Sequence, residues 1–94
     1  MQVAVLTVNL YAPWVHTLKE KRTEVKSLIA KVRNKFNVSV AEVDAQDFQQ
    51  TIVIGIAAIA ADAALADSIL DHVLNFLEAN TQAEIMQVWR EIGS

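Results

Sequence analysis

The segment from Thr51 to Ala60, TIVIGIAAIA, decides the fold that we predict. Its apolar residues occupy both alternating faces, a pattern typical of a strand inside a sheet that is covered on both sides. Gly55 interrupts the run, and a glycine within a strand indicates a bulge or a close backbone approach. A second run of this kind, Val3 to Tyr11, is too short for a helix and is stopped by Pro13. These two segments predict the central strands of one sheet.

Two further segments of the chain are more polar than these runs. Val38 to Asp44 alternates apolar and polar residues, and Glu84 to Ile92 carries polar residues on both faces. Such strands suit the edges of a sheet, where one side of the backbone stays unpaired. Between Val38–Asp44 and the Thr51 strand, Ala45-Gln46-Asp47 supplies the residue types that favour a turn.

Helical spacing accounts for the two remaining segments. Thr17-Leu18-Lys19-Glu20 fits a capping box, in which the Thr17 hydroxyl accepts from the Glu20 amide and the Glu20 carboxylate returns a bond to the Thr17 backbone. Asp62 can cap a second helix that ends at Asn80-Thr81-Gln82. The predicted buried stripes are Leu18, Val25, Leu28, Ile29, Val32 and Phe36 in the first helix, and Leu65, Ile69, Val73, Phe76 and Leu77 in the second.

The element order is therefore strand, helix, strand, strand, helix, strand. It predicts an α+β, ferredoxin-like βαββαβ domain over residues 1–94, a four-stranded antiparallel sheet with two helices on one face. The other sheet face would be open, and would present either Val3, Val5 and Val53 or Leu6, Val8 and Ile54, near Trp89. Because contiguous apolar patches of that size are uncommon on monomers, we expect this face to be buried in a homodimer.

Composition excludes several classes of protein. The 94 residues include no cysteine, so disulfides, thiolate nucleophiles and cysteine metal sites are absent. The apolar run that begins at Ile52 stops at Asp62, well short of the roughly 18 residues that a membrane span needs. We interpret the start, MQVAVLTVNL, as a strand rather than a signal peptide. These features favour a cytoplasmic protein with no membrane partner.

Charge is distributed unevenly along the chain. The net charge is −3, yet seven of the eight basic residues lie between Lys19 and Lys35. On a helical wheel, four of them occupy an arc of roughly 60° on one flank of the apolar stripe and span about 21 Å along the axis. These four are Lys19, Arg22, Lys26 and Arg33; the other flank mixes Lys21, Lys31 and Lys35 with Glu20 and Glu24.

An unmatched row of cations could contact several phosphates of a nucleic-acid backbone, without sequence specificity. A solvated helix flank, or cations matched by a neighbouring acidic surface, explains the same pattern. Trp14, in the loop before the helix, could stack on a base or could cover the end of the core. Base stacking on the central strands is not expected, since only Tyr11, at the end of the first, is aromatic.

The segments LKEKRTEVKSL, RNKFNVSVAEVD and QDFQQTIVIGIAAIAAD resemble the YlxP-like family of small bacterial proteins, a domain of unknown function. The resemblance covers nearly the whole chain and implies a ferredoxin-like fold. Genes of this family often lie beside those of a translation initiation factor and a ribosome-binding factor, which implies a role near ribosomes. It implies no catalytic residue. Phe48 departs from the family, whose members often carry Trp there.

No catalytic constellation is recognisable. The chain has only two glycines and lacks a phosphate-cradling loop, a Ser-His-Asp set and an HExxH motif. Glu42, Asp44 and Asp47 gather near a turn, where they could hold a cation or could simply protect an edge strand from aggregation. We therefore predict a non-enzymatic protein with no cofactor and no assigned metal site.

The favoured hypothesis is an accessory protein that binds structured RNA or a ribosomal subunit through Lys19, Arg22, Lys26 and Arg33, with Trp14 as a further contact. A protein–protein module whose basic helix docks on an acidic partner is the first alternative. A dimeric domain that binds a small ligand is the second. DNA sequence specificity is not expected, because backbone contacts carry no base code.

Overall fold

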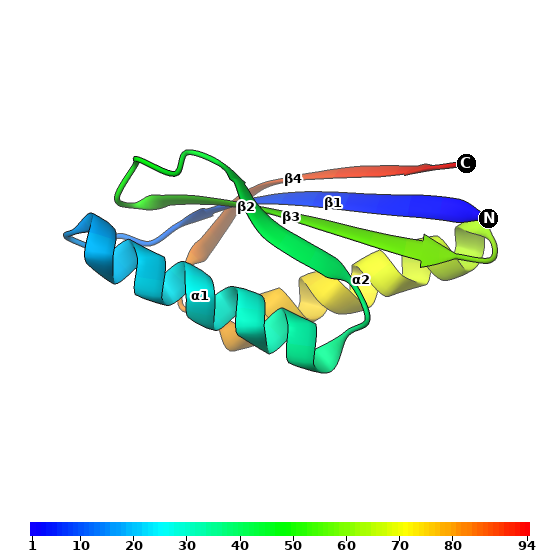
Figure 1. The fold of residues 1–94 in the computed structure, drawn as a ribbon, viewed down its shortest axis with the longest axis horizontal. Coiled ribbons are helices and arrows are strands. Elements are labelled where there is room, and N and C mark those ends of the chain that lie inside the picture. Colours follow the sequence, from blue (N-terminus) through cyan, green and yellow to red (C-terminus); the bar gives the residue numbers. More distant parts are fainter.

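The computed structural model describes residues 1–94 and confirms the ferredoxin-like α+β fold (Figure 1). The sheet has the order β2-β3-β1-β4, and every neighbouring pair is antiparallel. The two apolar strands are therefore central and the two polar ones form the edges, as predicted. The elements are β1 (Gln2–Tyr11), α1 (Leu18–Lys35), β2 (Ser39–Asp44), β3 (Thr51–Ala60), α2 (Ala63–Asn80) and β4 (Glu84–Gly93).

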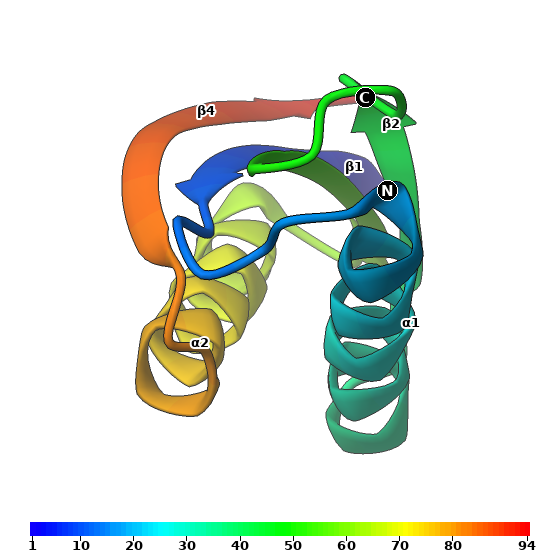
Figure 2. The same cartoon turned by 90° about the vertical axis from the view of Figure 1, so that its left-hand side faces the viewer.

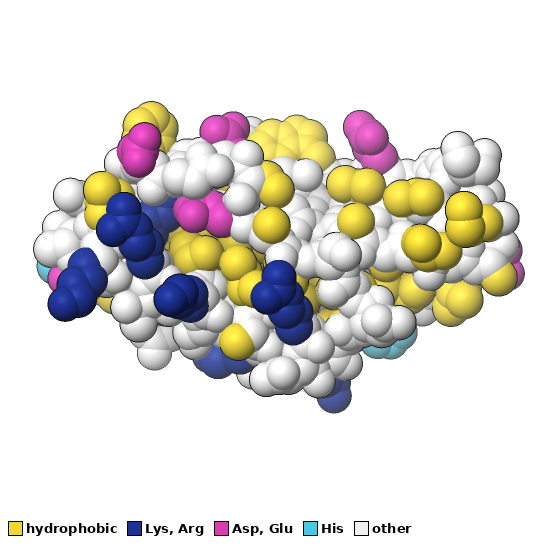
Figure 3. Space-filling model, viewed as in Figure 1, with side chains coloured by type: hydrophobic (Ala, Val, Ile, Leu, Met, Phe, Trp, Pro, Cys, Tyr) yellow, Lys and Arg dark blue, Asp and Glu magenta, His cyan; other side chains and the backbone are white.

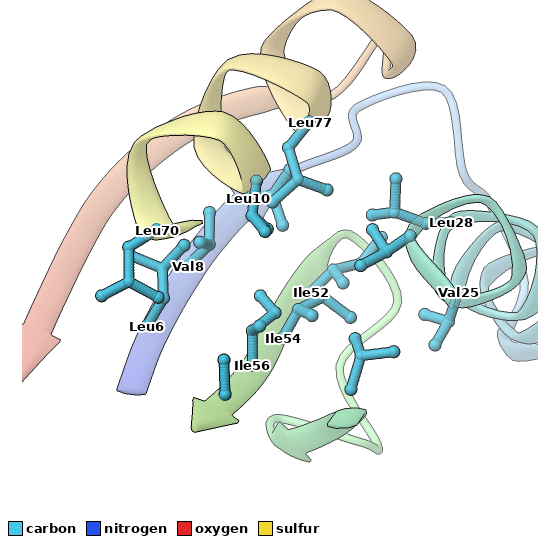
Figure 4. Packing of buried hydrophobic residues seen from close by; sticks show 14 of the residues in the cluster. Leu6, Val8, Leu10, Val25, Leu28, Ile52, Ile54, Ile56, Leu70 and Leu77 are labelled. Atoms are coloured by element: carbon cyan, nitrogen blue, oxygen red, sulfur yellow. The ribbon is translucent and has the colours of Figure 1, made fainter. Parts of the chain in front are cut away.

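Both helices cover the same face of the sheet, α1 below β2, and α2 below β1, β3 and β4 (Figure 2). Neither helix combines the length and the apolar character that crossing a bilayer demands. The core between helices and sheet consists of 19 buried apolar residues (Figure 4). Strand β1 contributes Leu6, Val8 and Leu10 to this core, so the open face carries the other predicted set, Val3, Val5 and Val53.

Gly55 permits a close approach and is not a bulge. It pairs regularly with Thr7 on one side and Ala41 on the other. The irregularity lies in β2, where the register shifts between Glu42 and Asp44. A Cβ at Gly55 would lie 2.7 Å from Val43 Cγ1, so the glycine makes room for the Val43 side chain. The close approach is thus by a side chain, whereas the sequence had indicated the backbone.

Both helices begin at the predicted caps. Thr17 Oγ1 accepts from the Glu20 amide at 3.1 Å, and Asp62 Oδ1 accepts from the Leu65 amide at 2.8 Å. The capping box is only half formed, because the Glu20 carboxylate lies 3.5 Å from the Thr17 hydroxyl and does not reach the Thr17 amide. Each of the two caps satisfies one of the free amides at a helix start.

The buried stripe of α2 differs from the predicted one. Leu65 is 48% exposed, whereas Ala66 and Leu70 are fully buried. The buried positions 66, 70, 73 and 77 keep helical spacing, and their axis is rotated by about one residue from the predicted stripe. The small Ala66 allows the first turn to lie close to the sheet, which leaves the bulkier Leu65 outside.

Candidate nucleic-acid interface

The four predicted cations form one row on the flank of α1 that faces the β2 edge. Lys19, Arg22, Lys26 and Arg33 are all exposed, and none takes part in an ion pair. Arg33 Nη2 donates to the Val40 carbonyl oxygen at 3.2 Å, which fixes the side of the helix on which the row lies. Figure 3 shows Lys and Arg side chains gathered over α1 on this face. We call these four residues the basic row.

The opposite flank of α1 faces α2 and is partly matched within the molecule. Lys31 Nζ donates to the Asn80 carbonyl oxygen at 3.5 Å. Glu24 and Lys31 line a polar groove of about 400 Å³ together with residues at the end of α2. This flank therefore carries both signs of charge, unlike the basic row.

Trp14 lines the groove beside α2 and does not join the basic row. It is partly buried and packs against the core, which agrees with a role in covering the core's end. Gln50 holds its loop, since Gln50 Nε2 donates to the Pro13 oxygen at 3.1 Å and to the Val15 oxygen at 3.2 Å. The body of α1 thus separates the indole from the four cations.

Lys21 corrects the sequence-based picture of α1. It had been assigned to the mixed flank with Glu20 and Glu24, but its side chain is only 1% exposed. Lys21 Nζ lies 2.9 Å from Glu42 Oε2 and donates to the Ala45 carbonyl oxygen. The contact with Glu42 is electrostatic, because Oε2 receives no hydrogen bond. The buried positions 21, 25, 28 and 32 follow helical spacing, and that periodicity was the available signal.

The loop between β2 and β3 begins beside the first half of α1, at the contact between Lys21 and Ala45, and then rises away from the helix layer (Figures 1 and 2). Its entry is fixed by Ala45, which has a φ of 55° and whose amide donates to Asp44 Oδ1 at 2.7 Å. The Phe48 amide then donates to the Ala45 oxygen at 3.0 Å. The Phe48 ring is left 65% exposed. Sequence reasoning had treated this aromatic only as a departure from the family, although an aromatic in a polar loop was a usable signal.

The acidic residues of this region do not form a cation site. Glu42 points toward Lys21, and Asp44 Oδ1 accepts a hydrogen bond from the Ala45 amide. No group of three or more Asp, Glu, His or Cys side chains converges anywhere in the chain. Helix α1 and this loop therefore present four exposed cations and one exposed ring.

Comparison with known proteins gives a family and one curated relative. The family model of DUF503, a protein of unknown function, matches residues 3–90. The uncharacterized protein YlxP of Bacillus subtilis (strain 168) is 38% identical over 68 residues, which cover 72% of this chain and 74% of that protein. Both matches agree with the resemblance noted from the sequence. No function is attached to either.

A comparison with solved structures corrects one prediction. The chain is similar, with a TM-score of 0.44 and 14% identity over 99% of its length and 91% of the other chain, to a mutant of SnoaB, a cofactor-independent oxygenase from Streptomyces nogalater. The prediction that the protein is not an enzyme is contradicted, since missing motifs and cofactor sites do not exclude catalysis in a protein of similar shape. So remote a likeness transfers no reaction and no residue to this chain.

Proposed function

The chain belongs to the DUF503 family, whose function is unknown, and we propose that it binds structured RNA through the basic row of α1. The observation that carries this proposal is that four exposed cations share one flank of α1 and that none of them has an ion-pair partner. Cations without an internal partner can bind the phosphates of a nucleic-acid backbone, and this binding releases the counterions that those phosphates had held.

The geometry of the row suits a backbone contact. Fourteen residues separate Lys19 from Arg33, so the row extends for about 21 Å along a capped helix. That length passes several phosphates, and arginine can bind each with two parallel hydrogen bonds. Because phosphates carry no base identity, the row supplies affinity and salt dependence but no sequence specificity.

Phe48 supplies the stacking contact in place of Trp14. Lys21 and the Ala45 turn fix the loop that carries it, and the ring is exposed. Aromatic side chains stack on unpaired bases, which structured RNA presents in its loops and bulges. A helix flank that contacts the backbone and an exposed ring in the loop after β2 that receives a base together favour a folded RNA with unpaired nucleotides. The family resemblance makes ribosomal RNA in the cytoplasm the first candidate.

A matched pair of charge reversals tests this proposal. Lys19→Glu with Lys26→Glu removes two members of the basic row, and Lys31→Glu with Lys35→Glu makes the same change in net charge on the other side of the helix. We expect the first pair alone to weaken binding to ribosomal subunits in co-sedimentation. The slope of log K against log salt concentration should fall by about 1.5 to 2, close to one unit per lost phosphate contact.

The outcomes separate the alternatives. Equal losses from both pairs would mean that only the overall field attracts RNA, and the basic row would lose its assignment. No binding to RNA, combined with capture of an acidic protein that survives nuclease treatment, would establish the protein–protein module instead. Phe48→Ala should reduce affinity for RNA with unpaired loops by about tenfold while leaving the salt slope unchanged, because stacking releases no counterions.

A further inference from the structure

The open face of the sheet mixes exposed apolar side chains with polar ones such as Thr7, Asn9 and Gln87, and Arg33 of the basic row lies at its β2 edge. The side chains of this face come from Val3, Val5 and Thr7 of β1 and from their neighbours across the sheet. Glu91 and Glu84 are its only charges along β4. Several of its large side chains are exposed: Val3 (39%), Val43 (51%), Ile59 (68%), Met86 (54%) and Trp89 (50%). Such a face, opposite a fully packed core, resembles one half of a sandwich interior.

We propose that two copies of this chain pack open face to open face around a two-fold axis parallel to the strands. The axis would run between β1 and β3, so that β4 of each copy lies over β2 of the other. Trp89 of each copy then lies over Ala41 of its partner. This dimer does not depend on RNA binding.

The strand register carries this proposal. One row across the sheet reads Trp89, Thr7, Gly55, Ala41, from β4 to β2. Its largest side chain therefore stands at one edge, and its small residues occupy the other half, where the Val43 side chain lies over Gly55 and leaves Ala41 as the receiving position. A two-fold axis through the middle of the row places the large end of each copy on the small end of its partner. Large side chains that face small ones across an interface can interdigitate, which a well-packed interface requires.

The next row repeats the arrangement. It reads Glu91, Val5, Ala57, Ser39, so that Val5 would face the small Ala57 of the partner. Glu91, the one charge in this row, would lie over the Ser39 hydroxyl, which can donate a hydrogen bond to a carboxylate. A hollow of about 560 Å³ already lies along the receiving half, lined by Ala41, Val43, Gly55 and Ala57 among others, and Arg33 of the basic row also lines it.

The available area sets the strength of the dimer. Strands of up to ten residues at about 3.3 Å each, four of them about 4.8 Å apart, give a face of roughly 600 Å² per copy. The total buried area would be about 1,200 Å², the lower limit for stable complexes. We therefore expect a reversible dimer whose population changes with concentration. The two basic rows would lie on opposite outer layers, at diagonal corners, as two separate sites.

Sedimentation equilibrium over a wide concentration range tests the association. The mass should rise from 10.4 kDa toward twice that value. Trp89→Lys and, on the receiving side, Ala41→Lys should each raise the dissociation constant by at least about 30-fold. Leu65→Lys, which changes an exposed apolar side chain of α2 on the helix side of the sheet, should leave the dissociation constant unaltered. A constant monomer mass would overturn the proposal. So would a dimer whose dissociation constant is unchanged in both the Trp89→Lys and the Ala41→Lys variants.

Fluorescence follows the indole directly. Trp14→Phe leaves Trp89 as the sole tryptophan, since the chain has two. Its emission should shift to shorter wavelength as concentration rises through the dimerisation range, because burial removes water from the ring. An unshifted spectrum in a solution that sedimentation shows to be dimeric would place the interface elsewhere.

Cross-linking tests the direction of the axis. The chain lacks cysteine, so introduced thiols have no competitors. A short bismaleimide should join copies that carry both Glu91→Cys and Ser39→Cys, and should leave each single variant uncoupled, because residue 91 faces residue 39 only across the proposed axis. Strong coupling of the Glu91→Cys variant with itself would indicate an axis perpendicular to the strands and contradict this geometry.

Discussion

The two helices are alike in construction and opposite in charge. Each has 18 residues, begins at a side-chain cap and buries four side chains against the sheet. Helix α2 has no lysine or arginine, and two of its carboxylates, Asp67 and Asp71, bind Arg90 of β4. Asp67 Oδ1 accepts a hydrogen bond from Arg90 Nη1, and this bond is the main cause that raises the pKa of Arg90. The charges of α2 are thus partly matched internally, whereas the basic row of α1 has no ion-pair partner.

The largest effect on stability should come from the buried stripe, a feature that both helices have. Leu77→Ala should lower the free energy of unfolding by about 3 kcal/mol, because it leaves a cavity at a fully buried site. Leu65→Ala in the same helix should lower it by less than about 1 kcal/mol, since that side chain is 48% exposed. Urea unfolding measures both values. Equal losses would show that the stripe predicted from sequence, with Leu65 inside, is the correct one.

The second largest effect on stability should come from the buried cation Lys21, a feature that only α1 has. Lys21→Met should lower the free energy of unfolding by about 2 kcal/mol, because it leaves the Glu42 carboxylate without its partner. The loss should be smaller than for a fully enclosed ion pair, since the Glu42 side chain is 19% exposed. The double variant Lys21→Met with Glu42→Leu should recover most of that loss. Urea unfolding of the two variants supplies the comparison. If the double variant were no more stable than the single one, the ion pair would not be the cause.

Loss of the Lys21 contact should also loosen one particular loop. Without the hydrogen bond to the Ala45 oxygen, amide hydrogen exchange should accelerate at residues 45–50 more than in the rest of the sheet. The charge-conserving Lys21→Arg variant provides a control, since it keeps a donor at this position. Uniform acceleration across β2 and β3 would mean that the contact stabilises the whole fold and not this loop.

The sequence predicted the strand order and most element bounds because those depend on local patterns. The β3 bounds, both caps and the polar edges follow from alternation and capping residues within a few positions. What it missed depends on distant partners. Lys21 is buried by Glu42 and by Ala45, 24 residues away, and Trp14 is directed toward α2 by Gln50. A helical wheel places side chains around one axis and contains no information about the neighbouring elements.

The caps should contribute equally in the two helices. Thr17→Ala and Asp62→Ala each remove one acceptor for a free amide, at Glu20 and Leu65, and each should cost about 1 kcal/mol. Thermal unfolding followed by circular dichroism gives the comparison. A much larger loss for Thr17 would indicate that the half-formed capping box closes in solution, with Glu20 reaching the Thr17 amide.

The smallest effect should come from the acidic residues that distinguish α2. Asp71→Asn keeps the shape of the side chain and removes the charge that lies 2.8 Å from Arg90 Nη2. Since the Asp71 side chain is 58% exposed, water screens the pair, and the loss of stability should stay below about 0.5 kcal/mol and vanish in high salt. Glu78→Gln, an unpaired carboxylate on the same helix, is the matched control. A loss well above 1 kcal/mol would mean that Arg90 holds α2 on the sheet, and that internal pairing of the acidic helix is a structural requirement and not only a neutralisation of its charge.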